Sequence, residues 1–355
     1  MKIEAQGYEV IFNELAYESI AQLLVNKEYS KLIILTDDQV NEVVLPKFLQ
    51  RLQTTINFEI IEIASGEESK SIDTCIELWK ILSDFEIDRN ALLINVGGGM
   101  ITDLGGFVAS TYKRGIDFVN VPTSLLAMVD ASVGGKTGVN LNFLKNMVGT
   151  FTQPQMVIID ASFLETLPGE HLRSGLAEMY KHGLIADKSY WQQLKNLDQL
   201  SIEDLEMLIY HSIAIKNAFV TEDPYEKNIR KALNFGHTLG HAIETWSHQN
   251  QEVRALLHGE AIAIGTILEA YLSYRKNYLK REEFEEIQNT LNLMFEGIVF
   301  SKNDIEICIN FLKHDKKNQQ SEIQFVLLKE IGQFVINQTV SLEWIYEAFD
   351  VYNKN

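Results

Sequence analysis

The first 160 residues of the chain alternate between short apolar runs and longer amphipathic stretches. The apolar runs at 31–36, 58–63, 91–96 and 157–160 have the length and the β-branched content of buried strands. The stretch 71–85, which lies between two of these runs, has the spacing of an amphipathic helix. Strands that alternate with helices predict βαβ units, and therefore an α/β fold with a mostly parallel sheet.

From Leu172 onward the hydrophobic spacing becomes helical. Helices are predicted over 203–220, 230–246, 259–275, 282–295 and 341–352, and one β-like run over 323–328. A chain of 355 residues is long enough for two domains, because single cores stop growing at roughly 250–300 residues. We therefore predict an α/β domain over 1–168 and an all-α-rich domain over 169–355, with the boundary at Pro168-Gly169.

A glycine turn follows the apolar run 91–96 directly, in the order Gly97-Gly98-Gly99. Glycines between a strand and a helix let backbone N–H groups approach a phosphate, and the N-terminus of the helix favours the negative charge. The turn departs from the G-x-G-x-x-G pattern, because Thr102 stands at the third glycine position. A dinucleotide site and a tight turn without a ligand both remain open for this motif.

A glycine-rich, hydroxyl-rich and cationic segment runs from Arg114 to Asn146 and is interpreted as a loop. Its Gly135-Lys136-Thr137 ends like a P-loop, but Asp130 occupies the position of the first P-loop glycine, which excludes that motif. A structural loop and an anion-binding loop both fit the composition.

Two histidines, His237 and His241, lie four residues apart in a predicted helix and so project from one face. A helical histidine pair with a third ligand is a common way to build an open Zn²⁺ site. The third ligand could be His258 or Glu178. The alternative is a helix that carries two solvated or core histidines.

Charge and composition limit the function classes. The net charge of −18 argues against nucleic acid as a partner, although a local basic pocket could still bind a small anion. Cys75 and Cys308 lie in apolar segments and are expected to be buried, inert thiols. The N-terminus lacks the pattern of a signal peptide, and no apolar run approaches the roughly 18 residues of a membrane span. We expect a cytoplasmic protein without a membrane partner.

Six separated motifs and a closing one together resemble the 3-dehydroquinate synthases of the sugar-phosphate cyclase family. They read GGGMITDLGGFVAS, KRG, VPTSLLAMVDASVGGKTGVN, KNMVGTF, LPGEHLRSGLAEMYKHG and LNFGHTLGHAIE, closed by LHGEA. The resemblance covers residues 97–260 and implies an N-terminal NAD-binding α/β domain, a helical metal- and substrate-binding domain, and an active site in the cleft between them.

The resemblance also implies which residues bind metal and substrate. Zn²⁺, with Co²⁺ as a possible substitute, would be held by Glu178, His237 and His258, and His241 would become an active-site residue beside the metal. The other positions that match the family's substrate contacts are Arg114, Lys136, Asn146, Lys181, Lys216, Arg230, Asn234 and either Lys316 or Lys317.

For NAD, the resemblance implies contacts in both halves of the α/β domain. The matching positions are Asp37, Gln39, Glu67, Lys70, Gly98, Gly99, Asp103, Thr123, Ser124, Asp130, Lys136 and Thr166. An acidic residue after a strand suits a ribose hydroxyl and repels a 2′-phosphate, which favours NAD over NADP. Glu67 and Lys70 could instead form no more than a surface ion pair.

The implied reaction converts 3-deoxy-arabino-heptulosonate 7-phosphate to 3-dehydroquinate and phosphate, in the shikimate pathway. It proceeds through transient oxidation by NAD, loss of phosphate, re-reduction and intramolecular aldol closure. Three alternatives are a related sugar-phosphate cyclase, a metal-dependent NAD polyol dehydrogenase and a non-catalytic binding module. The segment 221–230 departs from the family at Pro224, where a second acid is usual, and at Asn228, where glycine is usual. We expect a homodimer.

Overall fold

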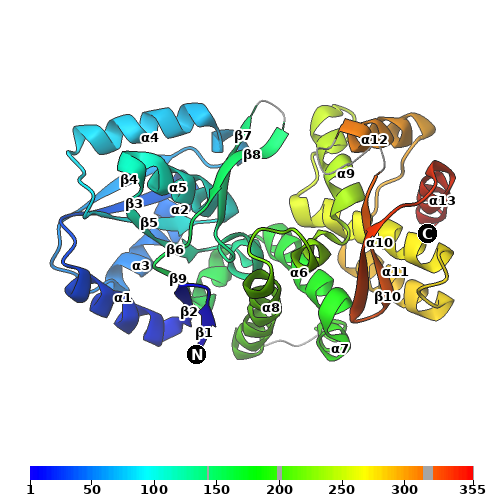
Figure 1. Cartoon of the computed structure of the whole chain (residues 1–355), viewed down its shortest axis with the longest axis horizontal. Helices are drawn as coiled ribbons and strands as arrows, with labels where there is room; N and C mark the ends of the chain where they lie inside the picture. Colours follow the sequence, from blue (N-terminus) through cyan, green and yellow to red (C-terminus); the bar gives the residue numbers. More distant parts are fainter. Residues whose placement is uncertain (142–143, 198–201, 315–322, 355) are drawn as a thin grey trace. The chain divides into compact units, whose positions relative to one another are not determined.

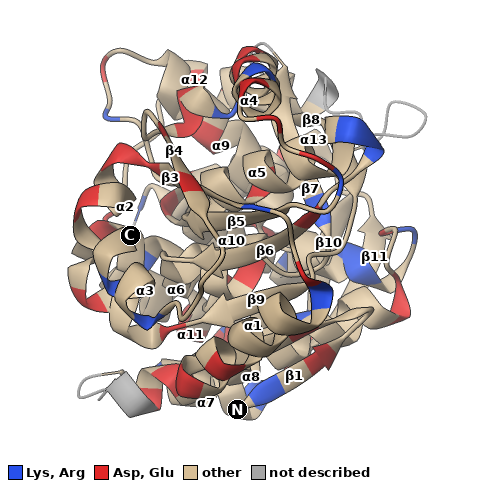
Figure 2. Cartoon of the chain, turned by 90° about the vertical axis from the view of Figure 1, so that its left-hand side faces the viewer, with Lys and Arg blue, Asp and Glu red and all other residues tan. Residues whose placement is uncertain are grey.

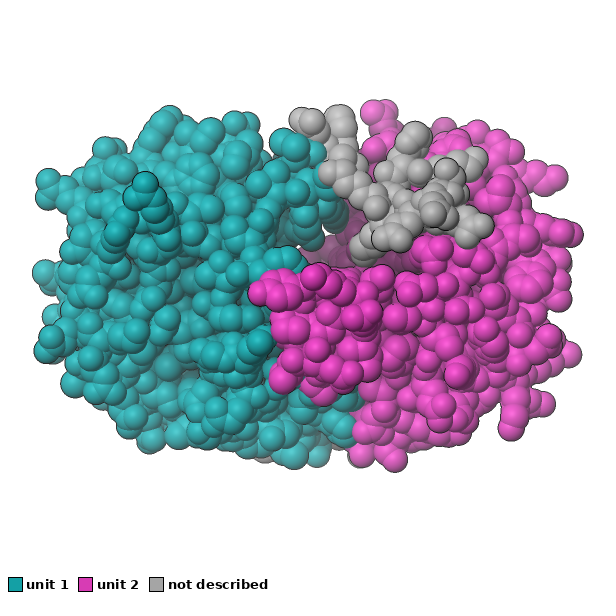
Figure 3. Space-filling model, in the orientation of Figure 1, with its two compact units in different colours: residues 1–168, 202–217 teal, residues 169–201, 218–355 magenta. Residues whose placement is uncertain are grey.

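The structure is a computed structural model that describes residues 1–141, 144–197, 202–314 and 323–354. The chain divides into two compact units, which Figure 3 colours separately. Unit 1 comprises residues 1–168 and 202–217, and unit 2 comprises residues 169–201 and 218–355.

Unit 1 is built around a seven-stranded sheet with the order β1-β2-β9-β6-β5-β3-β4. Only β1 is antiparallel to its neighbour, so the predicted α/β class with a mostly parallel sheet is confirmed. The strands of this sheet are β1 (Lys2–Ala5), β2 (Tyr8–Phe12), β3 (Leu32–Asp37), β4 (Phe58–Ile63), β5 (Leu92–Gly97), β6 (Asp117–Pro122) and β9 (Met156–Ile159).

Helices cover both faces of this sheet, as βαβ connections require. Figure 1 shows α4 and α5 on one side and α1 and α3 on the other. Because both faces are covered, β5 and β9 carry no charged residue and are tan in Figure 2. The helices that follow these strands are α1 (Asn13–Lys27), α2 (Asp38–Val43), α3 (Leu45–Arg51), α4 (Ile72–Asp84) and α5 (Gly99–Thr111), with short helical turns at η1 (Glu67–Ser69), η2 (Tyr112–Arg114), η3 (Ala127–Ala131) and η4 (Ala161–Thr166).

The carboxyl ends of β3, β5 and β6 meet at one edge of the sheet. Asp37 ends β3, and Gly97 of β5 lies opposite Pro122 of β6. From β3 the chain first adds β4 on one side and then β5 on the other. This reversal creates a topological switch point between β3 and β5, where open α/β sheets bind their ligands.

The predicted loop over 114–146 was wrong at 117–122, which forms strand β6 of the sheet, and again in its second half, where the chain forms a two-stranded hairpin. Strands β7 (Lys136–Leu141) and β8 (Leu144–Phe151) pair antiparallel, with an irregularity in register between Val139 and Leu141. Gly138 and Gly149 face each other so closely that a Cβ on Gly149 would lie 2.2 Å from the carbonyl oxygen of Thr137. The glycines therefore serve close strand pairing here.

Unit 2 is mainly helical, as predicted. Its helices are α6 (Gly169–Ala186), α7 (Lys188–Leu194), α9 (His237–Gln249), α10 (His258–Arg275), α11 (Arg281–Met294), α12 (Lys302–His314) and α13 (Leu342–Tyr352), with a hairpin of β10 (Phe325–Glu330) and β11 (Gln333–Gln338). Helix α8 (Ile202–Glu222) lies mostly in unit 1 and ends in unit 2. The single helix predicted over 230–246 was wrong, because Gly236 at φ 78° separates the 3-10 turn η5 (Ile229–Asn234) from α9.

Two predictions from composition can be compared with the structure. Cys75 and Cys308 are both free and buried, and burial raises the pKa of each thiol to about 12. In the described part of the chain, no helix has the length and apolar character needed to cross a bilayer.

Candidate functional site

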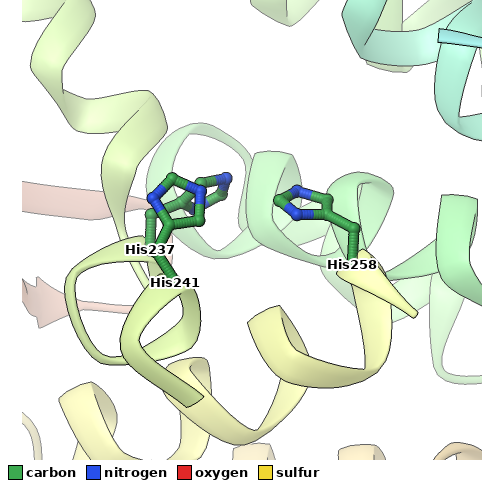
Figure 4. Close-up of side chains that lie close together, drawn as sticks. All are labelled: His237, His241 and His258. Carbon is green, nitrogen blue, oxygen red and sulfur yellow. The ribbon is translucent and has the colours of Figure 1, made fainter. Parts of the chain in front are cut away.

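Two helices of unit 2 bring the histidines together, and a third adds a carboxylate. Helix α9 begins at His237 and carries His241 one turn later, and α10 begins at His258. Figure 4 shows the three imidazoles pointing toward one another from these two helices. Helix α6 adds Glu178, which is completely buried.

The Oε1 atom of Glu178 lies between two imidazole nitrogens. Nε2 of His237 is 3.3 Å from it and Nε2 of His258 is 3.6 Å from it. Ligand atoms about 2.1 Å from a tetrahedral zinc ion lie about 3.4 Å from one another. This buried oxygen accepts no hydrogen bond from any residue that the structure describes. Spacing and chemistry both fit one metal ion held by Glu178, His237 and His258.

The other ring nitrogen of each proposed histidine ligand is held from outside the cluster. Nδ1 of His237 lies 3.0 Å from the carbonyl oxygen of Phe235, and Nδ1 of His258 lies 3.3 Å from Oε2 of the buried Glu244. Contacts of this kind fix the tautomer and turn Nε2 toward a metal.

The proposed metal ligands shift one another's pKa values. Burial raises the pKa of Glu178, but Lys181 and His237 outweigh this effect and hold it well below its usual range. Burial also lowers the pKa of His258, but Glu244 and Glu178 outweigh it and raise that pKa to about 10. For His237, burial dominates and lowers the pKa, which favours the neutral imidazole that binds metal.

His241 offers an alternative ligand set. Its ring centroid lies 5.1 Å from that of His237 and 5.7 Å from that of His258. One ring nitrogen from each of the three histidines can be chosen so that all three nitrogens lie within 4.8 Å of one another. The structure thus brings both candidate sets together, and the choice of Glu178 over His241 remains a prediction.

Lys181 lies beside the same carboxylate. It is one of the most deeply buried cations in the chain, with 1% of its surface exposed, and its Nζ donates to Oε2 of Glu178. The prediction that these residues share a helix face is confirmed by this contact. Lys181 leaves Oε1 of Glu178 facing the histidines.

A second cluster in unit 2 is organised by Asp223. Its two carboxylate oxygens accept hydrogen bonds from the backbone N–H groups of Lys227, Asn228 and Arg230, at 3.0, 2.6 and 3.2 Å. The left-handed backbone position of this loop is Glu226 at φ 56°. Asn228, which stands where the family usually has glycine, has a φ of −135°.

The same loop holds two of the proposed substrate residues. Arg230 is buried, and one of its guanidinium nitrogens donates to the carbonyl oxygen of Pro224 at 2.5 Å. The amide of Asn234 donates to the carboxylate of Glu226. Sequence reasoning did not single out Glu226, although it lies four residues before Arg230 and eight before Asn234.

In unit 1, Gly98 and Gly99 begin α5 at the carboxyl end of β5. No side chain in the described part of the chain caps this helix, whereas Asp37 caps α2 and Ser71 caps α4. A Cβ on Gly98 would lie 3.5 Å from Oγ of Ser124, and one on Gly99 would lie 3.1 Å from Cβ of Ala131. The first-turn N–H groups of α5 are therefore available to an anion beside Ser124.

Close packing of α5 on the sheet depends on Gly105, not on the position of Thr102. A Cβ on Gly105 would lie 1.9 Å from Oδ1 of Asn95, a buried residue of β5. The amide nitrogen of Asn95 donates to Oδ1 of Asn120 on β6 at 2.9 Å. The glycine that the dinucleotide motif places early in the helix thus has its structural counterpart one turn further on.

The Glu67–Lys70 segment is more than a surface pair. Lys70 is buried, and its Nζ donates to Oδ2 of Asp103 at 2.6 Å, whereas Oε1 of Glu67 lies 4.0 Å away. Burial raises the pKa of Asp103, despite the opposing effect of Lys70. Two proposed NAD positions that lie far apart in sequence therefore form one ion pair.

Asn140 connects this segment to the β7–β8 hairpin. Its side-chain amide donates to Oε1 of Glu67 at 2.9 Å, and its Oδ1 accepts from the backbone N–H of Asn146 at 2.9 Å. Its own N–H donates to the carbonyl oxygen of Lys70 at 2.9 Å. The irregular register of β7 at this point makes these contacts possible, but polar alternation alone could not have identified Asn140.

The remaining predicted residues of unit 1 differ in burial. Lys216 is buried and its Nζ lies 2.7 Å from Oδ1 of Asp130. Thr123 is also buried at the end of β6, whereas the exposed positions are Gln39, Arg114, Lys136, Asn146 and Thr166. Arg114 and Asn146 have left-handed backbone, with φ of 70° and 53°. Lys316 and Lys317 lie outside the described residues.

Comparison with known proteins agrees with this geometry. Residues 60–174 match the family model described as 3-dehydroquinate synthase N-terminal, and residues 175–318 match the model described as 3-dehydroquinate synthase C-terminal. A 3-dehydroquinate synthase of Parabacteroides distasonis is 40% identical over 348 residues, which cover 98% of each chain. The chain belongs to the 3-dehydroquinate synthase family. Its activity is that of a 3-dehydroquinate synthase, a lyase of the shikimate pathway.

Solved structures with the same fold contain the expected cofactors. The crystal structure of 2-deoxy-scyllo-inosose synthase complexed with carbaglucose-6-phosphate, NAD⁺ and Co²⁺ has a TM-score of 0.85 and 26% identity, covering 98% of this chain and 99% of the other. The 2-epi-5-epi-valiolone synthase from Streptomyces hygroscopicus, with NAD⁺ and Zn²⁺ bound, has a TM-score of 0.82 and 24% identity, covering 99% and 98%. The latter likeness shows the fold alone.

Proposed function

We propose that this 3-dehydroquinate synthase uses a divalent metal bound by Glu178, His237 and His258, with Zn²⁺ preferred and Co²⁺ as a substitute. The observation that supports the proposal is the position of the buried Glu178 Oε1, 3.3 and 3.6 Å from the two Nε2 atoms. When bound, a metal of this type polarises a substrate oxygen and helps it lose its proton. The structurally related 2-deoxy-scyllo-inosose synthase, crystallised with Co²⁺, lends further support.

His241 and Lys181 are proposed to serve the substrate beside these ligands. His241 shares the α9 face with His237, so its imidazole can hold or move a proton at the reacting hydroxyl. Lys181 balances the charge of Glu178 and presents an ammonium group to a substrate carboxylate or phosphate. Burial keeps both charges fixed before the substrate arrives.

NAD is proposed to bind unit 1 at the switch point between β3 and β5. When bound, it would accept a hydride from the substrate and return it, so that the net redox change is zero. The uncapped N-terminus of α5 can hold its pyrophosphate, and Asp37 at the end of β3 can accept a hydrogen bond from a ribose hydroxyl. Lys70 and Asp103 lie in the same unit and support the surrounding loop.

The substrate anions are proposed to bind to cationic and amide side chains. In unit 1 these are Arg114, Lys136, Asn146 and Lys216, and in unit 2 they are Arg230, Asn234 and Lys181, with Lys316 or Lys317 as a further candidate. A sugar acid phosphate carries both a carboxylate and a phosphate, which accounts for so many cations in an acidic protein. A polyol dehydrogenase would not need these cations. The alternative is a related cyclase that acts on a different sugar phosphate.

A turnover assay tests the proposal. The purified protein is incubated with 3-deoxy-arabino-heptulosonate 7-phosphate, Zn²⁺ and NAD⁺. The concentration of NAD⁺ is kept far below that of the substrate. Phosphate and 3-dehydroquinate should form in equal amounts, many times in excess of NAD⁺. NADH that accumulates one-for-one with turnover would indicate a dehydrogenase, and an absence of phosphate release would refute the proposed substrate.

Two variants separate the ligand sets. His237→Ala should lose both tight zinc binding and turnover, whereas His241→Ala should keep zinc and lose rate. Zinc content is measured by mass spectrometry of the metal after dialysis against a weak chelator. Equal loss of zinc in both variants would favour the three-histidine set over Glu178.

The division of labour and the assembly are also proposed. Residues 1–168 are assigned to NAD binding and residues 169–355 to metal and substrate, although residues 202–217 of α8 belong to unit 1. Lys216 lies in that segment, which is why a substrate residue from the second half of the sequence is found in unit 1. A homodimer and a cytoplasmic location remain predictions, to be tested by sedimentation and by cell fractionation.

A further inference from the structure

Helices α9 and α10 run antiparallel and touch through glycines. Gly265 of α10 lies so close to α9 that a Cβ on it would be 2.1 Å from the carbonyl oxygen of Gly236 and 2.6 Å from the nitrogen of Gly240. A Cβ on Gly240 would in turn lie 2.8 Å from Cδ1 of Ile262. Because the backbones themselves are in contact, a carboxylate side chain on α10 can reach the backbone at the start of α9.

Glu269 makes that reach. It lies one turn after Gly265 on the same face of α10, and none of its surface is exposed. Its Oε2 accepts the backbone N–H of Gly236 at 2.7 Å, and its Oε1 accepts the backbone N–H of Leu239 at 3.0 Å. These N–H groups belong to the first turn of α9, which would otherwise need an N-cap side chain.

The cap of α9 is therefore supplied by another helix. Gly236 occupies the N-cap position of α9 at φ 78°, where it has no side chain to act as a cap. The carboxylate of Glu269 instead accepts hydrogen bonds from two N–H groups that have no partner within α9, and it lies at the positive end of the helix dipole. His237 and Thr238 lie between the two capped N–H groups, so the position of the His237 backbone is set by Glu269.

At the other end of the contact between α9 and α10, Glu244 holds the first residue of α10. This α9 residue holds Nδ1 of His258, the first residue of α10. Each helix thus fixes the first residue of the other through a buried acid, and those two first residues are His237 and His258. The 3.3 and 3.6 Å distances to Glu178 depend on both helices keeping this register.

We propose that Glu269 is a positioning residue for the metal centre, which it serves by holding the start of α9 in register with α10. The inference rests on the metal site described under the proposed function. It assigns a role to a residue that touches neither metal nor substrate. Its loss lets the first turn of α9 fray or shift, and His237 then no longer meets His258 at the spacing of a metal site.

The test measures zinc affinity, not turnover alone. Glu269→Gln keeps the size of the side chain but turns one acceptor into an NH₂ group that faces an N–H. Its Kd for Zn²⁺, measured by competition with a chromogenic chelator, should rise by about 10–100-fold, as for other residues behind metal ligands. The zinc concentration that gives half-maximal turnover should rise in parallel, and KM for the sugar acid phosphate at saturating zinc should stay unchanged.

Glu286→Gln is the matched control. Glu286 of α11 also bridges two helices of unit 2, because it accepts from Nε1 of Trp191 on α7 at 2.7 Å. Its replacement should lower the Tm of the metal-free protein without changing zinc Kd by more than twofold. A Kd within twofold of the unmodified protein for Glu269→Gln would overturn the proposal and leave Glu269 with a purely structural role.

Hydrogen exchange of the unmodified chain gives an answer even if Glu269→Gln does not fold. Zinc should slow exchange at the amides of Gly236 and Leu239 more than at the amide of Leu291 in α11, because coupling between two sites is reciprocal. Equal effects of zinc on all three amides would contradict the proposal. An unmodified protein that binds no zinc at all would instead refute the metal site itself.

Discussion

Gly259 offers a direct test of how closely the metal ligands are held. It follows His258 on α10 and lies against the backbone of α6. A Cβ at this position would be 2.1 Å from the carbonyl oxygen, 2.5 Å from Cα and 2.6 Å from the carbonyl carbon of Ser174. Backbone atoms cannot rotate away as a flexible side chain can. Gly259→Ala must therefore push α10 and α6 apart.

The size of this shift follows from the contact distances. Non-bonded heavy atoms settle at about 3.5 Å, so relieving the 2.1 Å contact requires the helices to separate by about 1.4 Å. Glu178 lies one turn after Ser174 on α6, and His258 is the neighbour of Gly259. The 3.6 Å distance between their ligand atoms should open to about 5 Å, beyond the roughly 3.4 Å edge of a tetrahedral zinc centre.

Two measurements check the expectation. Overpacking should lower the free energy of unfolding by about 1–3 kcal/mol in urea, and chelator competition should show zinc affinity reduced by at least tenfold. Gly183→Ala is the control, because its Cβ would press on the backbone nitrogen of Trp191 in α7 at 2.9 Å, away from α10. It should destabilise the chain and keep zinc affinity. A Gly259→Ala protein with unchanged zinc affinity would refute the link between this contact and the ligand spacing.

Three further predictions concern Asp223, Gly105 of α5 and Asn140 of β7. Three backbone hydrogen bonds hold the pKa of Asp223 below the unfolded value of about 3.9, despite burial, so its stabilising effect is present above that pH and is lost as pH falls through the folded pKa. Asp223→Asn should thus lower the unfolding free energy at pH 7, and urea titrations should show the difference shrinking below about pH 4. Gly105→Ala should clash with Asn95 and cost about 1–2 kcal/mol net of its better helix propensity, with weaker NADH binding by fluorescence titration. Asn140→Asp should weaken NAD binding about two- to tenfold by replacing a hydrogen bond to Glu67 with charge repulsion, and an effect that high salt does not reduce would contradict this reason.

The sequence pattern predicted strands best where an apolar run stands between turn signals. Strand β4 was predicted at its observed bounds, and β3, β5 and β9 within one residue. The expectation that 58–63 is a buried strand was wrong, because β4 is an edge strand in which only Ile61 is buried. Strands β1 and β2 were missed, since a short antiparallel edge mixes charged and apolar residues, and β6 was missed because it lies inside the segment that was interpreted as a loop. Hairpin β7–β8 was read as a loop because its glycines serve pairing that only the partner strand reveals.

The chemistry of the site was predictable in part. The spacing of His237 and His241 indicated one helix face, but it could not show that α9 begins at His237 itself. Glu178 comes from a helix that lies some sixty positions earlier, so spacing left it as one of two candidates for the third ligand, and only the resemblance implied that both bind. Glu244 and Glu269 were missed because an acid on a helix usually points to solvent. Their signal was helical spacing: Glu244 follows His237 by seven residues, and Glu269 follows His258 by eleven, both whole numbers of turns within one residue.

The charge of the chain looks at odds with its proposed anionic ligands until burial is considered. A net charge of −18 repels anions over the outer surface, and this argues against nucleic acid. Yet Lys70, Lys181, Lys216 and Arg230 are each at most 5% exposed. Buried charges are screened little by salt and respond mainly to their immediate partners. Three of the four lie against a single carboxylate, Asp103, Glu178 or Asp130, and Arg230 lies against a carbonyl oxygen. These partners hold the cations in fixed positions before any ligand binds. The net charge therefore describes the exterior that a nucleic acid would meet, whereas the four buried cations are set apart from that exterior, each held by its own partner.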